Sequence, residues 1–441
     1  MSVQTKNNTF TAIVIIAMMF FIFGILTWIN SILIPYFKIG CELNNFESYL
    51  VAFAFYIAYL VMAIPSGLLL KRVGFRKGIM IGFWTVAAGA FIFVPAGLNR
   101  SYPLFLTGLF AIGVGLAILQ TAANPYVTIL GDKERAAQRF SIMGICNKMA
   151  GILAPLVFAA LIIRPGDQQV FDALPTMDAL TKERTLDELI ARVSTPYAFL
   201  SAGLFLFGCF IRFSPLPDLD ADKEKNPALM KGKKSILDFP HLVLGAFAIF
   251  FHVGSQVIAV DSIINYTTSM GVPLAEAKVF PAYTLTATII GYLLGIILIP
   301  RFFSQLQALR WCTILGFVLS GCILVTSQEV HWLGHAVDLS VWLIVLLGFA
   351  NSMIWAGIWA LAMDRLGSFV KTGASLLVMG LCGNAILPLI YGYLADRTGL
   401  QSAYIVLLPC YAYLIFYAFH AYRLKSWKRR IKIDYEVPET V

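Results

Sequence analysis

Several amide side chains stand inside long apolar stretches of this sequence. Gln120 and Asn124 are four residues apart, so they share one face if the stretch is helical. Amides both donate and accept hydrogen bonds, which suits sugar hydroxyls, and tryptophan faces can stack on a hexose. We therefore take as candidate substrate-binding residues Asn30, Gln120, Asn124, Asn147, Gln256, Asn351, Trp355, Trp359 and Asn384. The alternative is structural, because amides in membrane helices often bond only to a neighbouring helix, and a tryptophan stripe is typical of packing or of an interface belt.

Lys148 is the most unusual charged residue, because it lies deep inside an apolar stretch. A lysine at the centre of a membrane helix costs about 2.5–3.5 kcal/mol on insertion scales. We expect it to couple a cation or to donate to a substrate. The alternative is a structural pair with a buried carboxylate, for which Asp261 is the comparable acid, and such a pair would act as a gate. Ser31 and His252 complete the candidate coupling and gating residues, although a lone histidine is more typical of helix packing.

The composition requires a membrane setting for these residues. Hydrophobic types make up 59% of the 441 residues, charged types only 13%, and the mean hydropathy is +0.79. Soluble domains carry about 25% charged residues, so soluble and disordered classes are excluded. A membrane helix needs about 20 apolar residues. The chain predicts about twelve such spans, near 10–36, 48–70, 78–97, 103–130, 138–163, 196–213, 240–268, 276–300, 308–326, 339–364, 372–394 and 401–422.

Basic residues predict the orientation of these spans. With the N-terminus inside the cell, most of the 33 Lys and Arg residues fall in cytoplasmic loops, the central break and the tail. We therefore expect both termini in the cytoplasm and a multi-pass protein of the inner membrane. The net charge of +9 is then a topology signal and does not call for nucleic acid. The basic tail is expected to face membrane lipid.

A polar stretch divides the spans into two groups. We expect an all-α membrane protein of two pseudo-symmetric six-helix bundles, with a site between them at mid-depth. The expected parts are an N-terminal bundle 1–213, a cytoplasmic linker 214–238, a C-terminal bundle 239–423 and a cytoplasmic tail 424–441. Met143–Asn147 and Met379–Asn384 are weakly similar at equivalent positions of the two halves. Thr181–Val193, in the long loop 164–196, suggests a short surface helix.

Catalytic and cofactor motifs are not found in the sequence. It contains no CxxC, HExxH, Walker or GxSxG pattern. We therefore expect no enzyme and no cofactor, and leave an integral-membrane transferase as the remote alternative. The polar residues within the spans lead us to expect a membrane transporter of a sugar coupled to a cation. A sugar transporter without a coupling ion is the nearer alternative.

Four segments carry a resemblance to a known family. Gln120–Gly131, Trp28–Phe37, Gly67–Lys77 and Phe349–Trp355 resemble segments of the fucose and glucose/galactose symporter family of the major facilitator superfamily. The resemblance implies the major facilitator fold and uptake of a monosaccharide by a rocker-switch motion, coupled to H⁺ or Na⁺. It also implies a cytoplasmic gate loop after the second span, with Gly67, Arg72, Gly74 and Arg76.

Two positions depart from the fucose branch of that family. Ser31 and Gln120 stand where the fucose branch has acids. The glucose/galactose or amino-sugar branch is therefore the better match, with a neutral hexose or N-acetylated hexosamine as the expected substrate. Na⁺ held by neutral oxygen atoms is the candidate metal, although the sequence does not locate its ligands. A monomer is the expected state.

Overall fold

The computed structural model describes residues 3–129, 136–214, 216, 235–299, 301–366 and 369–427. Within them, twelve helical stretches are long and apolar enough to cross a membrane, which confirms the number expected from the sequence. The N-terminal half contains α1 (Val3–Trp28), α2 (Asn30–Gly40), α3 (Asn45–Ser48), α4 (Leu50–Val73), α5 (Phe75–Leu98), α6 (Tyr102–Ile129), α7 (Ala136–Ile162), α8 (Asp167–Ala173), α9 (Ala179–Ala191) and α10 (Ser194–Phe213).

The C-terminal half repeats this plan with more interruptions. It contains α11 (Pro240–Asp261), α12 (Ile263–Ser269), α13 (Leu274–Ala277), α14 (Phe280–Leu298), α15 (Gln305–Val325), β1 (Glu329–Trp332), β2 (His335–Asp338), α16 (Leu339–Asn351), α17 (Ile354–Ala362), α18 (Val370–Met379), α19 (Gly383–Thr398) and α20 (Leu407–Phe419). The two halves form two helical bundles, as expected. Most of the expected linker 214–238 and of the tail 424–441 lies outside the described residues, so those boundaries stay predictions.

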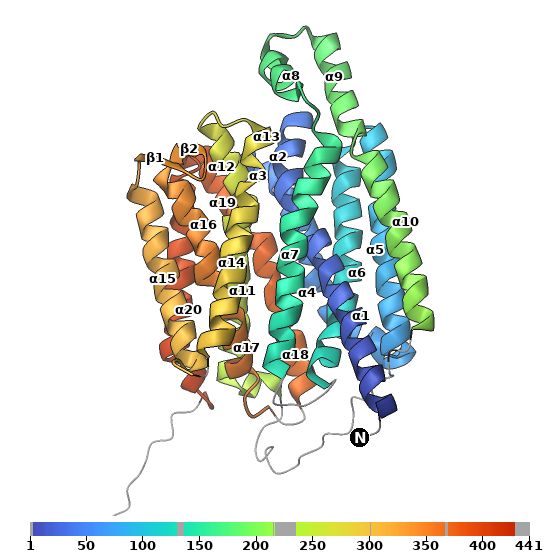
Figure 1. Ribbon diagram of the computed structural model, residues 1–441, viewed down its shortest axis with the longest axis vertical. Helices are drawn as coiled ribbons and strands as arrows, with labels where there is room; N and C mark the ends of the chain where they lie inside the picture. The colour runs from blue at the N-terminus through green and yellow to red at the C-terminus, as the bar shows by residue number, and fades with distance from the viewer. Residues whose placement is uncertain are drawn as a thin grey trace, which may run out of the picture.

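Figure 1 shows α8 and α9 projecting at one end of the molecule and the N-terminus at the opposite end. We call these the α9 end and the N-terminal end. The surface helix expected at Thr181–Val193 is α9, which starts and ends two residues earlier. The carboxylate of Asp178 caps it by accepting a hydrogen bond from the Thr181 amide at 3.0 Å, and this bond lowers the pKa of Asp178. Helix α8 was not predicted.

A short hairpin at the α9 end interrupts the helical architecture of the described residues. Strands β1 and β2 pair antiparallel, with Glu329 opposite Asp338 and Trp332 opposite His335. Leu333 and Gly334 make the turn, both with positive φ (50° and 83°), which is the requirement of a type I′ turn. The leucine in the first turn position hides this hairpin from sequence analysis.

Close helix packing relies on glycine. A Cβ atom at Gly89 of α5 would lie 2.8 Å from the carbonyl oxygen of Gly108 on α6 and 2.7 Å from the amide nitrogen of Ile112. Two facing glycines therefore allow these backbones to approach closely, as is common between membrane helices.

Several spans break near polar residues, among them the eleventh, where a 3-10 turn at Gly380–Cys382 separates α18 from α19 just before Asn384. The first span breaks at Ile29 between α1 and α2, the seventh at Ser262 between α11 and α12, and the tenth between Asn351 and Ile354. The hydroxyl of Ser262 donates to the carbonyl of Ile258 at 2.6 Å, and such back-bonding bends helices. Interrupted helices free backbone and side-chain polar groups at membrane depth, where transporters bind substrates and ions.

The two bundles meet at the α9 end. There α19 packs against α3 and the start of α4. A Cβ atom at Gly392 would lie 2.7 Å from the Tyr49 ring and 3.0 Å from the Asn45 carbonyl oxygen. The rings of Tyr49 and Tyr391 meet edge to face, with centroids 5.6 Å apart. A glycine at position 392 therefore permits this contact between the bundles.

Candidate functional site

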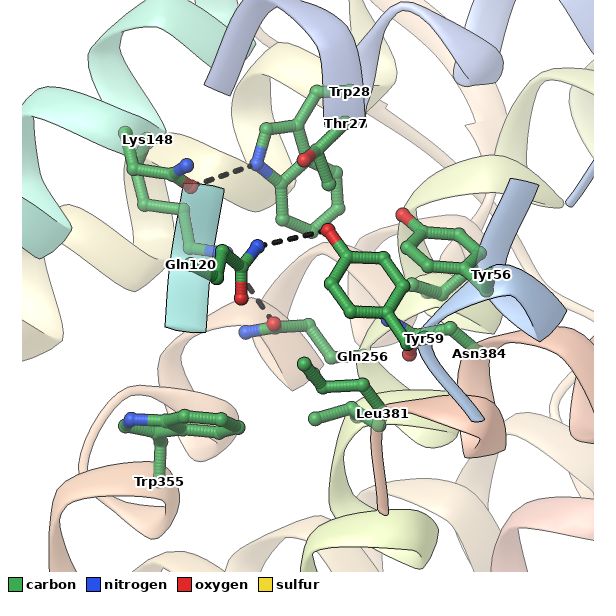
Figure 2. A pocket seen from close by; sticks show the side chains of 13 residues that line it. Thr27, Trp28, Tyr56, Tyr59, Gln120, Lys148, Gln256, Trp355, Leu381 and Asn384 are labelled. Atoms are coloured by element: carbon green, nitrogen blue, oxygen red, sulfur yellow. Dashed lines mark hydrogen bonds between the residues drawn. The ribbon is translucent and has the colours of Figure 1, made fainter. Parts of the chain in front are cut away.

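A cavity lies where the two bundles face each other. Its volume is about 120 Å³, smaller than the ~300–1,000 Å³ typical of small-molecule sites. Helices of both bundles line it, as Figure 2 shows, and no single bundle forms it alone. The lining residues are Thr27, Trp28, Tyr56, Tyr59, Gln120, Asn147, Lys148, Val253, Gln256, Val257, Trp355, Leu381 and Asn384.

Most polar groups around the cavity are oriented by hydrogen bonds. The indole of Trp28 donates to the Asn147 carbonyl oxygen at 3.1 Å, and the Asn147 amide donates to the backbone carbonyl of Phe20 at 3.3 Å. The Gln120 amide donates to the Tyr59 hydroxyl at 2.9 Å, as the dashed line in Figure 2 shows. The buried carbonyl oxygen of Asn384 has no partner among the described residues and is available to accept from a ligand hydroxyl.

The side chain of Lys148, on α7 of the N-terminal bundle, contacts the C-terminal bundle. Its side chain is buried, and Nζ donates to the Gln256 carbonyl oxygen at 3.3 Å. The same ammonium lies 3.9 Å from the centroid of the Trp28 ring, within the range of a cation–π contact. Figure 2 shows Lys148 and Gln256 approaching from opposite sides of the cavity.

The Lys148–Asp261 pair considered from the sequence does not form. Both carboxylate oxygens of Asp261 are buried without a hydrogen-bond partner in the described part of the chain. The reason is position along α11: Gln256 stands at the level of Lys148, and Asp261 lies further toward the α9 end. Lys148 instead lies within electrostatic range of His252, which precedes Gln256 by one helical turn.

Five of the nine candidate substrate-binding residues line the cavity: Gln120, Asn147, Gln256, Trp355 and Asn384. Three others lie behind its wall. Asn351 accepts a hydrogen bond from the Tyr411 hydroxyl at 3.1 Å, so it joins two helices of the C-terminal bundle. Trp359 stacks on Trp355, with centroids 5.5 Å and planes 22° apart, so it supports that ring. Asn30 is fully buried and does not line the cavity, and the Asn124 side chain lies outside the described residues.

The other coupling and gating candidates are dispersed. Ser31 donates to the Trp28 carbonyl at 2.9 Å and so stabilises the break in the first span. In the expected gate loop, Gly74 joins α4 to α5 with φ +79°, and Arg76 donates to the Ser214 carbonyl at 3.3 Å. Arg72 is exposed, and a Cβ atom at Gly67 would meet open space. The gate role of this loop stays a prediction.

Aromatic residues of the first and second spans were missed as site residues. Tyr56 and Tyr59 are three residues apart on α4 and both line the cavity, as do Thr27 and Trp28. The three-residue spacing of the tyrosines was the available signal, because it places both hydroxyls on one helical face. Tyrosine in a membrane span is also typical of packing, which hides this signal.

Two helical bundles around a central polar cavity define a multi-pass membrane transporter. The family model of the Major Facilitator Superfamily matches residues 16–382, and the chain belongs to this superfamily. The chain is not an enzyme, since its relatives named below are transporters.

Relatives of established description cover almost the whole chain. The chain is 32% identical to a glucose/galactose transporter of Brucella abortus biovar 1 (strain 9-941) over 94% of its own length and 95% of the relative's. It is 28% identical to the L-fucose-proton symporter of Escherichia coli (strain K12), with 91% and 90% covered. The expected preference for the glucose/galactose branch is confirmed.

A solved structure supports the same fold. The crystal structure of the superfamily transporter FucP in the outward conformation matches with a TM-score of 0.69 and 25% identity. The match covers 93% of this chain and 98% of that one. The expected major facilitator fold is therefore confirmed.

Proposed function

We propose that this protein takes up a neutral monosaccharide of the glucose/galactose or N-acetylated hexosamine class by alternating access, coupled to a proton. The observation that carries the proposal is the make-up of the central cavity. Four amides (Gln120, Asn147, Gln256 and Asn384) and two tryptophans line it, and they come from both bundles. Among the described residues, no Asp or Glu lines it. This polarity suits a neutral polyhydroxylated ligand better than a charged one.

Each kind of lining group has a role toward such a ligand. The amides read hydroxyls through paired donor and acceptor atoms. Trp355 offers its ring face for stacking on the apolar face of a hexose. Lys148 donates to a ring or hydroxyl oxygen. A ligand that bonds Lys148 and Gln256 together draws the two bundles toward each other, which is the motion that alternating access needs.

The proton is proposed as the coupling ion because two relatives are named as proton symporters. The Na⁺ alternative has no comparable support. The fully uncoupled facilitator remains as the competing outcome of the transport test below.

The setting follows from the charge distribution and the folded architecture. We propose that the N-terminal end faces the cytoplasm and the α9 end faces outward, in the inner membrane, since the basic residues Arg72, Arg76 and Lys77 lie where α4 joins α5, at the N-terminal end. The protein is proposed to act as a monomer in contact with lipid, with no nucleic-acid partner.

Counterflow in proteoliposomes tests the substrate proposal. Vesicles loaded with unlabelled glucose, galactose or N-acetylglucosamine should accumulate the same labelled sugar transiently and saturably for at least one of the three. Gln120→Ala should raise the half-saturating concentration by about 2–12-fold, the loss of one hydrogen bond of ~0.5–1.5 kcal/mol. The matched control is Gln169→Ala, an exposed amide on α8 that should leave exchange unchanged. Absence of saturable exchange for all three sugars would reject the proposal.

Accumulation separates coupled from uncoupled transport. With an inward proton gradient, the wild-type protein should raise the internal sugar concentration above the external one. Equilibration without accumulation, under both a pH and a Na⁺ gradient, would instead establish a facilitator.

A further inference from the structure

Asp261 carries a buried carboxyl group that the sugar site leaves unexplained. Only 1% of the residue is exposed, and both oxygens lack a hydrogen-bond partner among the described residues. It ends α11, directly before the break at Ser262. The neighbouring hydroxyl cannot serve it, because Ser262 is engaged with the Ile258 carbonyl at 2.6 Å and the Tyr404 hydroxyl at 2.7 Å.

Two tyrosines of the opposite bundle lie near enough to this carboxyl group to interact with it electrostatically. Tyr49 and Tyr56 belong to the start of α4 and are seven residues apart, so they share one helical face. Both lie within electrostatic range of Asp261. Both are buried, and neither hydroxyl makes a well-formed hydrogen bond in the described part of the chain, although the Asn265 side chain lies beside the Tyr49 hydroxyl. The interface between the bundles therefore holds a carboxyl group and two hydroxyls that are enclosed together without satisfied bonds.

Other titratable groups near this level are engaged elsewhere. On the C-terminal side, Tyr391 of α19 donates to the Leu400 carbonyl at 3.0 Å, and the Tyr266 hydroxyl of α12 bonds with that of Ser340 at 2.7 Å. Two cations of the N-terminal bundle are also engaged: Lys38 of α2 bonds to Asn45 at 2.6 Å, and Lys148 of α7 bonds to Gln256.

The opposite bundle forms the cover over Asp261. Tyr49 lies against Tyr391 and Gly392, where the bundles meet at the α9 end. Separation of the bundles at that end withdraws Tyr49 and Tyr56 from Asp261 and admits water. Tyr56 also lines the central cavity, so it stands between Asp261 and the sugar site.

We propose that Asp261 is the proton-binding group of this transporter. The inference rests on the proposed sugar:proton symport. When the bundles are apart at the α9 end, the carboxylate takes one proton from hydronium: an O–H bond of hydronium breaks, the carboxyl O–H bond forms, and a water molecule is left. An ionised carboxylate that is enclosed and receives no hydrogen bond, as here from either tyrosine hydroxyl, is strongly disfavoured, so the bundles cover Asp261 only after it is neutral. Opening toward the N-terminal end lets water, reached past Tyr56, take the proton back.

Coupling to sugar follows from the shared helix. Gln256 and Asp261 both stand on α11, and both face the N-terminal bundle, at Lys148 and at the two tyrosines. Sugar bound between Lys148 and Gln256 favours closure of the interface between the bundles. Closure of that interface also requires a protonated Asp261. Each ligand therefore strengthens the binding of the other, as linkage demands.

The test compares proton movement with sugar exchange in Asp261→Asn. Asparagine keeps the size of the side chain and mimics its neutral form. Proteoliposomes containing a pH-sensitive dye receive the hexose that gives the strongest wild-type counterflow. We expect Asp261→Asn to retain counterflow within about twofold and to lose more than tenfold of sugar-driven proton entry. Asp172→Asn, an exposed acid on α8, is the matched control and should match the wild type in both assays.

The outcomes separate the two proposals. Wild-type protein without counterflow contradicts the proposed function. Wild-type counterflow without sugar-driven proton entry contradicts the proposed coupling and the role of Asp261 with it. Normal wild-type behaviour with proton entry preserved in Asp261→Asn overturns the role of Asp261 alone, as does loss of counterflow in folded Asp261→Asn.

A second variant covers a failure of Asp261→Asn to fold. Asp261→Glu keeps a titratable group at a shifted position, so proton entry should persist with its half-maximal pH displaced. A pH profile identical to that of the wild type would overturn the proposal.

Discussion

Asn45 and Asp396 join the two bundles at the α9 end. The Asn45 side-chain amide donates to Asp396 Oδ1 at 2.6 Å, and its backbone amide donates to the same oxygen at 3.0 Å. The backbone amide of Phe46 donates to the second oxygen at 2.9 Å. One carboxylate of the C-terminal bundle thus satisfies the free amides at the start of α3. These bonds exist only while the bundles touch at this end.

Asp396→Asn should therefore favour opening of the α9 end. Asparagine loses the negative charge and one acceptor, and we expect a shift of about 1 kcal/mol, or ~fivefold, since the site is exposed. Thr268, in the crevice between the bundles at this end, is a suitable reporter. In a Cys41→Ser background, Thr268→Cys should react several-fold faster with a membrane-impermeant maleimide when Asp396→Asn is present. Asp187→Asn, which pairs with Arg100 inside the N-terminal bundle, is the control, and equal acceleration by both would contradict the prediction.

Replacement of Lys148 should weaken sugar binding without lowering the thermal stability of the protein. Lys148→Met removes a buried charge whose insertion costs about 2.5–3.5 kcal/mol, so the melting temperature in detergent should stay unchanged or rise. The lost charged donor should raise the half-saturating sugar concentration in counterflow by ~10–100-fold. Lys278→Met serves as the control for loss of a lysine away from the cavity. A clear fall in melting temperature would show that Lys148 has a structural role instead.

Hydropathy predicted the spans, and the cost of polar groups in lipid predicted much of the cavity. Asn147, Lys148, Gln256 and Asn384 were found because polar side chains at membrane depth avoid lipid. That argument predicts that a polar side chain points into the protein, but it does not predict what the side chain meets there. It therefore also selected Asn351, which bonds to Tyr411 on a neighbouring helix and does not line the cavity.

Contacts between distant segments were beyond the sequence. The bonds between Asn45 and Asp396 join exposed polar residues at opposite ends of the chain, and neither residue stands in a pattern that indicates the other. The sequence left open whether Asp261 pairs with Lys148 for a related reason: two charges in apolar spans suggest an ion pair, but their depths depend on the helix break at Ser262 and on bundle placement.

The two tryptophans of α17 should differ in their effect on sugar transport. Trp355 lines the cavity, whereas Trp359 lies behind it and stacks on Trp355. Trp355→Ala should raise the half-saturating concentration in counterflow by more than tenfold. Trp359→Ala removes an aromatic pair worth about 0.5–1.5 kcal/mol and should raise it by ~2–12-fold. Trp311→Ala, at an exposed position on α15, should have no effect. A larger effect from Trp359→Ala would contradict the prediction, because it would show that Trp359 and not Trp355 stacks on the sugar.

The rate at which a maleimide labels the thiol of Cys41, between α2 and α3 at the α9 end, should depend on pH in a way that shows its burial. Burial raises the pKa of Cys41 to about 11, against an ordinary value of 9.0, although Arg100 acts in the opposite direction. Maleimides react with the thiolate, so a raised pKa means little thiolate at neutral pH. The labelling rate by an impermeant maleimide should be low at pH 7 and rise about tenfold per pH unit up to pH 10. Cys41→Ser identifies the signal, and a rate that levels off near pH 9 would show that the thiol is exposed to water.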